Sequence, residues 1–291
     1  MKRALVVGAG GAVGEAIALA LHAKGWRVDA RMRTPNAHAD ARLRAAGIET
    51  GLLDLSDADA TARALEGASA AVFTPILSTS IAALPAASRL EHVVFVSSNN
   101  VSVDPDAPVY RALAEAEARV RQRAPRAAIL RPTLIYGDPR LPAVPAAMKL
   151  MRRLPVFPMP GAGRALQQPI HCADLAAVAA AALVDAPGAL YAVGGPDIVP
   201  MRDFYAAMMT AMDLRKPITA TPRAVLHVGR ALLGARFPLD ARQIARADRD
   251  RIAPPHLAPP PAWAPRIGVA EGMASLARAL GFAADHVRSN T

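Results

Sequence analysis

The sequence predicts an α/β protein with a doubly wound parallel sheet, followed by a smaller, mostly helical C-terminal lobe. Short apolar runs alternate with helical segments, and a glycine-rich turn directly follows the first run. The amino-acid composition changes near residue 138, where prolines become frequent. Strands that alternate with helices at this spacing are typical of a parallel sheet with helices on both faces.

The first strand is expected over residues 4–7, an apolar run that ends at a glycine as a buried parallel strand would. The helix expected over 15–24 is closed by Gly25, just past its end, where glycine is favoured. The unit then repeats as a strand over 28–32 and a helix over 39–46 that Gly47 closes.

The alternation continues to further strands, which are expected over 48–53, 70–73, 93–96, 128–130 and 190–193. Further helices are expected over 57–65, 81–89 and 110–123. The last of these is the clearest, because alanine, glutamate and arginine fill its exposed face.

A domain boundary is predicted near residue 138. Residues 1–138 would form the sheet domain, and the chain would return to that sheet near 165–195. Residues 139–291 would form a substrate lobe that is loop-rich at first and helical afterwards. The loop-rich part is expected because prolines cluster at positions 139, 142, 145, 155, 158 and 160.

The composition favours a cytoplasmic globular protein. With 53% hydrophobic residues, the chain of 291 residues has enough apolar side chains for a large core. Its single cysteine, Cys172, excludes an internal disulfide and a cysteine-based zinc site, so no metal is expected. No apolar stretch is long enough to cross a membrane.

The formal net charge of +10 has no accompanying nucleic-acid motif, so no nucleic-acid partner is expected. Segment 221–251 holds seven arginines against three aspartates, a net of +4. The apolar residues Val225, Leu226, Leu232 and Leu233 stand beside that charge. Peripheral contact with anionic lipid or an acidic partner is one interpretation. A helix that covers a substrate pocket is the favoured one.

The turn after the first strand has the pattern of a Rossmann-type dinucleotide site. Gly8 would permit the tight turn, Gly11 the close approach of a pyrophosphate, and Gly14 the packing of helix on sheet. The helix N-terminus would then offer free N–H groups to the phosphates. The cofactor-binding residues expected here are Gly8, Gly10, Gly11, Ala12, Val13 and Gly14.

The end of the second strand favours NADP(H) over NAD(H). An NAD site usually has an acidic residue there, which holds the ribose 2′-hydroxyl. Met32 stands at that position, and Asp29 comes too early, inside the strand. Arg31 and Arg33 are therefore candidates to hold a 2′-phosphate; plain solvent exposure is their alternative.

Further motifs make the chain resemble the NAD(P)-dependent epimerase/dehydratase family, the extended or atypical short-chain dehydrogenases. The resemblance covers nearly the entire chain. Besides the glycine turn, it rests on Arg33-Thr34-Pro35, Asp54-Leu55-Ser56-Asp57, Val94-Phe95-Val96-Ser97-Ser98, Leu130-Arg131-Pro132-Thr133, Gln168-Pro169-Ile170-His171 and Tyr191-Ala192-Val193-Gly194-Gly195.

The resemblance implies further cofactor contacts. They are Asp54 and Leu55 beside the adenine, Thr74 and Pro75 beside a ribose, Ser97 and Ser98 near the nicotinamide, and Pro132 and Thr133 in its pocket wall. It implies a monomer or a homodimer that pairs through helices such as 110–123. The substrate is a small molecule that the sequence does not identify.

Active members of this family use a Tyr-x-x-x-Lys pair with a serine or threonine. The lysine is missing here. Four residues after Tyr110 stands Ala114; the other alignment puts Val109 and Leu113 at the tyrosine and lysine positions. Ser98 and Tyr110 remain the catalytic candidates.

Two functions are compatible with this pattern. The first is an NADP(H)-dependent oxidoreductase or epimerase-like enzyme, since a reductase needs only hydride delivery and one proton donor. The alternative is a non-catalytic NADP(H)-binding regulatory or accessory subunit. The loss of the lysine favours the alternative, whereas the retained lobe motifs favour the enzyme.

Overall fold

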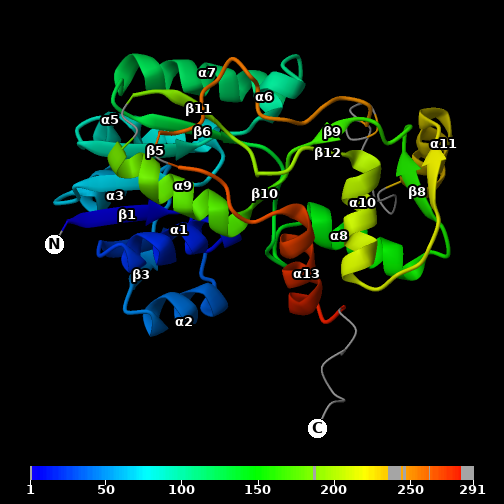
Figure 1. Ribbon diagram of the computed structural model, residues 1–291. Helices are drawn as coiled ribbons and strands as arrows, with labels where there is room; N and C mark the ends of the chain where they lie inside the picture. Colours follow the sequence, from blue (N-terminus) through cyan, green and yellow to red (C-terminus); the bar gives the residue numbers. More distant parts are fainter. Residues whose placement is uncertain (1, 186–187, 235–243, 245–246, 262, 283–291) are drawn as a thin grey trace, which may run out of the picture.

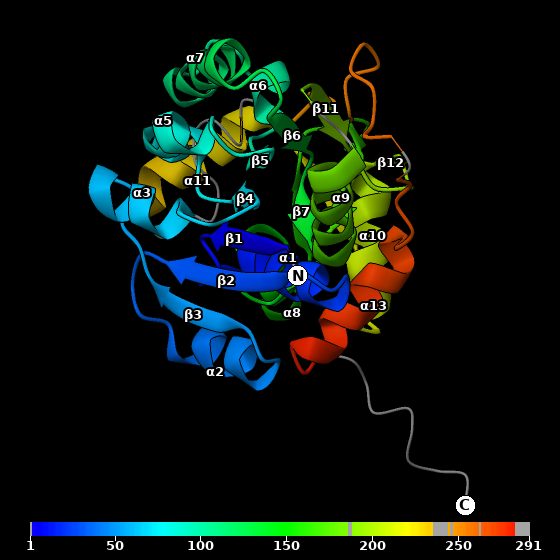
Figure 2. The same ribbon diagram turned by 90° about the vertical axis from the view of Figure 1, so that its left-hand side faces the viewer.

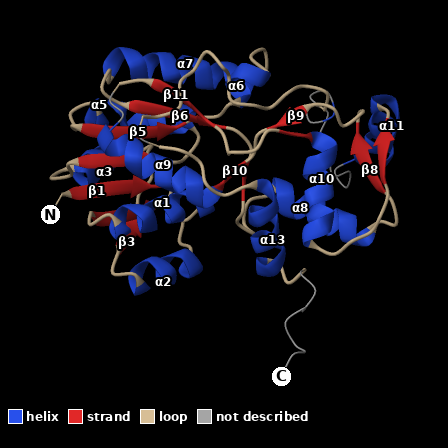
Figure 3. Ribbon diagram, in the orientation of Figure 1, coloured by secondary structure: helices blue, strands red, loops and turns tan. Residues whose placement is uncertain are grey.

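The computed structural model describes residues 2–185, 188–234, 244, 247–261 and 263–282. A seven-stranded sheet with helices on both faces occupies one end of the molecule (Figure 1). A smaller lobe of helices and short strands occupies the other end (Figure 3).

The main sheet has the strand order β11-β6-β5-β4-β1-β2-β3, and every neighbouring pair is parallel. Its strands are β1 (Arg3–Val7), β2 (Arg27–Met32), β3 (Glu49–Leu52), β4 (Ala70–Phe73), β5 (His92–Val96), β6 (Ala128–Pro132) and β11 (Leu190–Val193). The predicted doubly wound parallel fold is confirmed. The strand order reverses between β1 and β4, and in open α/β sheets ligands bind at that switch point, beyond the carboxyl ends of the strands.

Alternate residues of each strand face two different cores, because side chains of a strand alternate between faces. Ala4 and Val6 pack with α1 (Ala12–Ala23), α2 (Ala37–Ala45) and α9 (Cys172–Asp185). Leu5 and Val7 pack with the helices of the other face. These are α3 (Ala58–Leu65), α4 (Leu77–Ser80), η1 (Ile81–Ala83), α5 (Leu84–Ala87), α6 (Asn100–Val103) and α7 (Pro108–Arg123). Figure 2 shows α3, α5 and α7 on one side of the sheet and α1 and α9 on the other.

The helix expected over 81–89 is instead three short pieces, α4, η1 and α5, between residues 77 and 87. Pro85 lies in the first turn of α5, where a missing N–H costs no hydrogen bond. Proline therefore starts a new short helix here instead of lying inside a continuous one.

The lobe is built around a methionine-rich core. It contains β7 (Ile135–Tyr136), α8 (Ala143–Arg153), β8 (Phe157–Pro160), β9 (Leu166–Gln167), β10 (Ile170–His171), β12 (Val199–Pro200), α10 (Met201–Ala211), β13 (Ile218–Thr221), α11 (Arg223–Leu233) and α13 (Val269–Ala279). Its buried methionines are Met148, Met151, Met159, Met201, Met208, Met209, Met212 and Met273. Methionine is unbranched and fills irregular space between packed elements.

The stretch expected to be loop-rich contains the helix α8. Pro142 is its N-cap and Pro145 lies in its first turn, so neither proline removes a helical hydrogen bond. At its C-terminal end, Lys216 Nζ donates to the carbonyls of Met151, Arg152 and Leu154 at 2.8–2.9 Å. Clustered prolines thus mark the start of a helix here, not the absence of one.

None of the helices in the described ranges is long and apolar enough to span a bilayer.

Candidate functional site

The glycine-rich turn joins the carboxyl end of β1 to the start of α1, beside the end of β4. Gly8 has φ +89°, and a Cβ there would lie 2.3 Å from Oγ1 of Thr74. A Cβ on Gly14 would lie 2.3 Å from the carbonyl oxygen of Gly8. Both positions therefore require glycine, one for the turn and one for the contact between α1 and the turn.

A cavity of about 610 Å³ opens at this turn, at the switch point of the sheet. Its lining includes eight residues expected from the sequence to contact a cofactor: Gly8, Gly10, Gly11, Ala12, Val13, Gly14, Thr74 and Pro75. Among the residues that the structure describes, no side chain caps the N-terminus of α1 at Gly11. Free N–H groups and the positive end of the helix dipole suit an anion at this place.

Asn36 also lines the cavity, although it is not among the residues that the sequence predicts as cofactor contacts. Its Nδ2 donates to the carbonyl of Gly10 at 2.9 Å, and its Oδ1 accepts from the N–H of Ala39 at 3.1 Å. One side chain thus caps α2 and holds the glycine turn. The signal in the sequence was an asparagine three residues before Ala39, at a helix N-cap.

Arg140 comes to the cavity from the lobe, together with Leu141. Its guanidinium lies 2.5 Å from Oε2 of Glu15 and 2.8 Å from Oδ2 of Asp138. Burial would raise the pKa of Asp138, but the hydrogen bonds from Arg140 outweigh it and lower that pKa. The structure thus places an arginine of the lobe at the glycine turn.

Glu15 is a buried carboxylate, 1% exposed, in the first turn of α1. Besides Arg140, Nε of Arg42 lies 2.9 Å from its Oε1. A buried charge is tolerated when it is paired, and an acidic group is favourable near a helix N-terminus. The two arginines join the glycine turn to α2 and to the lobe.

Arg31 and Asp29 form a pair inside the sheet. Nε and Nη2 of Arg31 lie 2.7 and 2.8 Å from the two carboxylate oxygens of Asp29, which also binds Arg3. The guanidinium of Arg31 covers Gly51, where a Cβ would lie 2.2 Å from Nη1. Arg31 does not line the cavity at the glycine turn.

Arg33 is exposed in the turn that follows β2. Asp54, expected beside the adenine, lies near it. The pKa of Asp54 is lowered by the backbone N–H and hydroxyl of Ser56, with a smaller contribution from the charge of Arg33. Leu55 is buried in the core that packs against α3 to α7.

Ser97 is engaged in a network at the carboxyl ends of β5 and β6. Its hydroxyl donates to Oε1 of Glu117 at 2.6 Å. Arg131 binds both oxygens of this buried carboxylate and donates to Ser102 Oγ at 3.0 Å. The hydroxyl of Ser97 thus orients a structural ion pair between β6 and α7. Pro132, the neighbour of Arg131, is the last residue of β6 and is buried.

The two catalytic candidates lie outside the lining of the glycine-turn cavity. Ser98 is half-buried, and its Oγ accepts the N–H of Asn100 at 3.2 Å. Tyr110 lies in the first turn of α7 and packs on the core of that face. Ala114, one turn later, is exposed, whereas Leu113 is 2% exposed. The alignment on Tyr110 therefore puts the lysine position at the surface.

His171 and Asp174 bind separate backbone groups. Nδ1 of His171 accepts the N–H of Ala173 at 3.2 Å, and burial lowers the pKa of the imidazole. Asp174 Oδ2 accepts the N–H groups of Arg266 and Ile267 at 3.0 and 2.9 Å. His171 thus holds the backbone at the start of α9, and Asp174 fixes the distant segment at residues 266–267; both contacts are structural and do not form a catalytic dyad.

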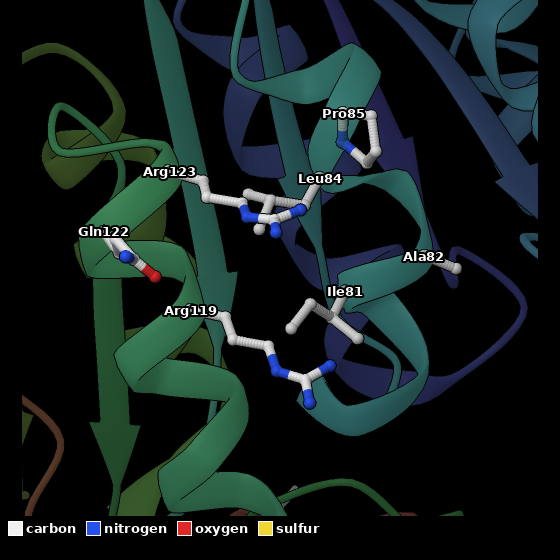
Figure 4. Close-up of a pocket in the computed structure, with 7 residues that line it drawn as sticks. All are labelled: Ile81, Ala82, Leu84, Pro85, Arg119, Gln122 and Arg123. Carbon is white, nitrogen blue, oxygen red and sulfur yellow. The ribbon is translucent and has the colours of Figure 1, made fainter.

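A second cavity, of about 650 Å³, lies between η1, α5 and α7 (Figure 4). Its lining residues are Ile81, Ala82, Leu84, Pro85, Arg119, Gln122 and Arg123. It shares no residue with the glycine-turn cavity and has no hydroxyl, imidazole or carboxylate in its lining. Acid–base chemistry is therefore not expected there.

In the described ranges, no group of three or more histidine, cysteine, aspartate or glutamate side chains is placed to hold a metal ion.

Residues 1–136 match the NmrA-like family. Two curated relatives match shorter parts of the chain. Subunit 9 of the NADH dehydrogenase [ubiquinone] 1 alpha subcomplex, mitochondrial, from Arabidopsis thaliana is 30% identical over 165 residues, or 53% of this chain. L-xylulose reductase from Bos taurus is 49% identical over 67 residues, or 23% of this chain. The matched parts span only 40% and 27% of these relatives.

Solved structures match nearly the whole chain. The NADPH-dependent quinone oxidoreductase QOR2 from Escherichia coli, complexed with NADPH, has a TM-score of 0.71 and 19% identity, covering 94% of this chain and 99% of that one. UDP-glucose 4-epimerase from Thermus thermophilus, in complex with NAD, has a TM-score of 0.68 and 20% identity, covering 95% and 98%. At these identities the likeness concerns the fold.

Proposed function

We propose that this chain binds a nicotinamide dinucleotide and acts as an oxidoreductase or epimerase-like enzyme of the extended short-chain dehydrogenase type. The shared fold and the NmrA-like match of residues 1–136 support the proposal. The observation that carries it is the cavity at the switch point, with its uncapped helix N-terminus and required glycines.

The residues of this cavity fit the phosphates of a dinucleotide. A Cβ added to Gly11 would have only the carbonyl oxygen of Gly8 nearby, at 3.6 Å, so the absent side chain leaves open space at the start of α1. Backbone N–H groups of α1 would hold the pyrophosphate, and Arg140 would face it from the lobe. Asn36 would keep the turn in the required shape.

The proposed cofactor is NADP(H), with NAD(H) less favoured. Arg31 is held by Asp29, which leaves Arg33 as the exposed arginine at the end of β2. A guanidinium binds a phosphate through two N–H groups, so Arg33 would hold the 2′-phosphate. Asp54 near Arg33 would compete for that guanidinium until the phosphate binds.

When bound, the cofactor supplies or accepts a hydride. This chain would supply the proton and the orientation of the substrate. The hydroxyl of Ser98 would donate a hydrogen bond to a substrate carbonyl, and Tyr110 would deliver the proton to its oxygen. Ala114 stands where the family's lysine would, so no lysine four residues further on would assist Tyr110.

A second candidate function is a non-catalytic NADP(H)-binding subunit. The similarity to a plant subunit named as part of an NADH dehydrogenase favours it, as does the missing lysine of the Tyr-x-x-x-Lys pair. In that case the cavity would bind the dinucleotide for stability or sensing, and no substrate would turn over.

Calorimetric titration of the purified chain with NADPH and NADH tests the proposal. The wild type should bind NADPH in the micromolar range, with weaker binding of NADH. Arg33→Ala should lose most of the NADPH affinity and leave the NADH affinity unchanged. Arg121→Ala, at an exposed arginine of α7, is the matched control.

Absence of binding for both nucleotides would contradict the proposed site as a whole. If Arg33→Ala loses the same affinity for NADPH and for NADH, only the proposed role of Arg33 at the 2′-phosphate is contradicted. Turnover of carbonyl substrates with NADPH, reduced in Ser98→Ala and Tyr110→Phe, would separate the enzyme from the accessory subunit.

A further inference from the structure

Helix α11 is the outermost element of the lobe. It follows β13, which pairs with β8, and in Figure 1 it lies at the opposite end of the molecule from the main sheet. Leu226 is the buried side chain of this helix in the described residues, at 4% exposed. The rest of the helix is open to solvent along almost its whole length.

Three large aliphatic side chains lie on the outer side of this helix. Val225, Val228 and Leu232, here called the α11 stripe, are 57%, 59% and 79% exposed. Their spacing of three and four residues puts them on one side of a helix. The other exposed large hydrophobics in the described part of the chain occur singly, at Leu52, Ile76, Val109, Val156, Val184 and Ile198. The stripe is thus a local concentration of apolar surface.

Basic side chains occupy the side of α11 opposite the stripe. At about 100° per residue, Arg223, His227 and Arg230 fall together within one narrow arc of the helix. All three are partly or fully exposed, and the helix sequence contains no aspartate or glutamate. One carboxylate from elsewhere, that of Asp248, pairs with Arg223. Segment 221–251 keeps its excess of four positive charges.

We propose that α11 is a membrane-surface helix that lies in the headgroup region of a bilayer containing anionic lipids. The α11 stripe enters the acyl boundary, and the long side chains of Arg223 and Arg230 reach the lipid phosphates that surround the helix. A helix with one apolar and one cationic side, without internal acidic groups, has the charge and shape that such an interface requires. This inference does not depend on dinucleotide binding.

The charge pattern favours lipid over a protein partner. An apolar protein interface would bury the stripe against another apolar surface and would gain little from cations on the far side of the helix. Phosphate headgroups instead surround a helix whose aliphatic side chains are inserted, so they supply negative charge at the level of the arginines. A guanidinium also binds phosphate through two N–H groups at once.

Sedimentation with vesicles tests the proposal on the full chain. The probes are vesicles of phosphatidylcholine and phosphatidylglycerol in equal parts, and vesicles of phosphatidylcholine alone. The test variant is Val228→Ser/Leu232→Ser, and its matched control is Val184→Ser/Ile198→Ser, which removes two aliphatic side chains of similar exposure elsewhere. Arg230→Glu is paired with Arg121→Glu on α7. Circular dichroism and thermal unfolding check that each variant is folded.

We expect the wild type to sediment with the anionic vesicles, and the partition coefficient to fall by about tenfold or more in Val228→Ser/Leu232→Ser. Arg230→Glu should weaken binding as well, and both control variants should bind like the wild type. Failure of the folded wild type to bind anionic vesicles overturns the proposal. Vesicle binding that Val228→Ser/Leu232→Ser leaves unchanged also overturns it. If this variant changes only the oligomeric state, measured by light scattering, the occupant of the α11 stripe is a second copy of the chain and the proposal is overturned too.

Discussion

Arg140 in the lobe and Glu15 in the first turn of α1 form an ion pair across 125 residues of sequence, with 2.5 Å between Nη1 and Oε2. The carboxylate of Glu15 is almost fully buried, beside the place where the proposed cofactor phosphates would lie. Arg140 and Arg42 together offset its charge. The ion pair therefore holds the lobe against α1 and, at the same time, sets the charge at the edge of the cavity.

Arg140→Ala should lower the free energy of unfolding by about 2–3 kcal/mol, because it leaves a buried carboxylate with one cation instead of two. Denaturation in urea measures the change. The double variant Glu15→Gln/Arg140→Ala, which also removes the buried charge of Glu15, should be more stable than Arg140→Ala alone. If the stability losses of Glu15→Gln and Arg140→Ala add up to that of the double variant, the two side chains are not coupled.

Gly11→Ala and Gly14→Ala should separate folding from cofactor binding. A Cβ on Gly14 would meet the backbone of Gly8 at 2.3 Å, and we expect about 1–3 kcal/mol of lost stability from this clash. Gly11→Ala meets nothing closer than 3.6 Å, and its free energy of unfolding should stay within about 1 kcal/mol of the wild type. Both should lose NADPH in calorimetric titration. A Gly14→Ala chain as stable as Gly11→Ala would show that the turn adapts.

His171 should make stability depend on pH below the ordinary histidine range. Burial lowers the pKa of its imidazole in the folded chain, so the unfolded chain binds the proton first. The contribution of the neutral imidazole to the free energy of unfolding is therefore fully present above about pH 6.5. It is lost as the pH falls from there toward the lower pKa of the folded chain. His171→Asn keeps an acceptor for the N–H of Ala173 and cannot titrate.

Melting temperatures measured from neutral to mildly acidic pH check this. The difference between the wild type and His171→Asn should shift in favour of the variant as the pH falls. Parallel curves for the two proteins would mean that His171 does not titrate in this range.

Cys172 should resist thiol reagents in the folded chain. It is 5% exposed, and burial raises the pKa of its thiol to about 12. The thiolate, which is the reactive form, is therefore scarce in mildly alkaline buffer. Labelling with a chromogenic disulfide should be slow in buffer and complete within minutes in denaturant. Cys172→Ala, with no thiol, gives the background; fast labelling of the native chain would contradict the burial of Sγ.

Local patterns predicted the sheet well, because most of its strands are apolar runs that end near a turn residue. The strands over 70–73 and 190–193 have the expected bounds. Eight expected cofactor contacts line one cavity, since they all belong to the segments that directly follow β1 and β4 at the same edge of the sheet. The proline-rich stretch was different: α8 forms there because Pro142 and Pro145 occupy its start, a placement that composition does not reveal.

The remaining parts of the site depend on contacts between distant segments. Nothing near Arg140 in the sequence indicates Glu15 as its partner. Arg31 and Arg33 look alike as exposed arginines at a strand end, yet Arg31 lies within β2 on the same face as Asp29 and binds it. The buried carboxylate of Glu117 likewise acquires its role from Ser97 and Arg131, which lie just after β5 and within β6.

The methionine-rich lobe core has a consequence for how such a chain can change over generations. Its interior is separate from the two cores that enclose the sheet. Flexible thioether side chains can repack around an altered neighbour at small cost, whereas the close-packed sheet cores, mainly alanine, leucine and valine, cannot. Mutations that reshape the lobe should therefore accumulate without disturbing the glycine turn. The ligand specificity of the lobe can then change while the proposed nucleotide-binding cavity stays the same.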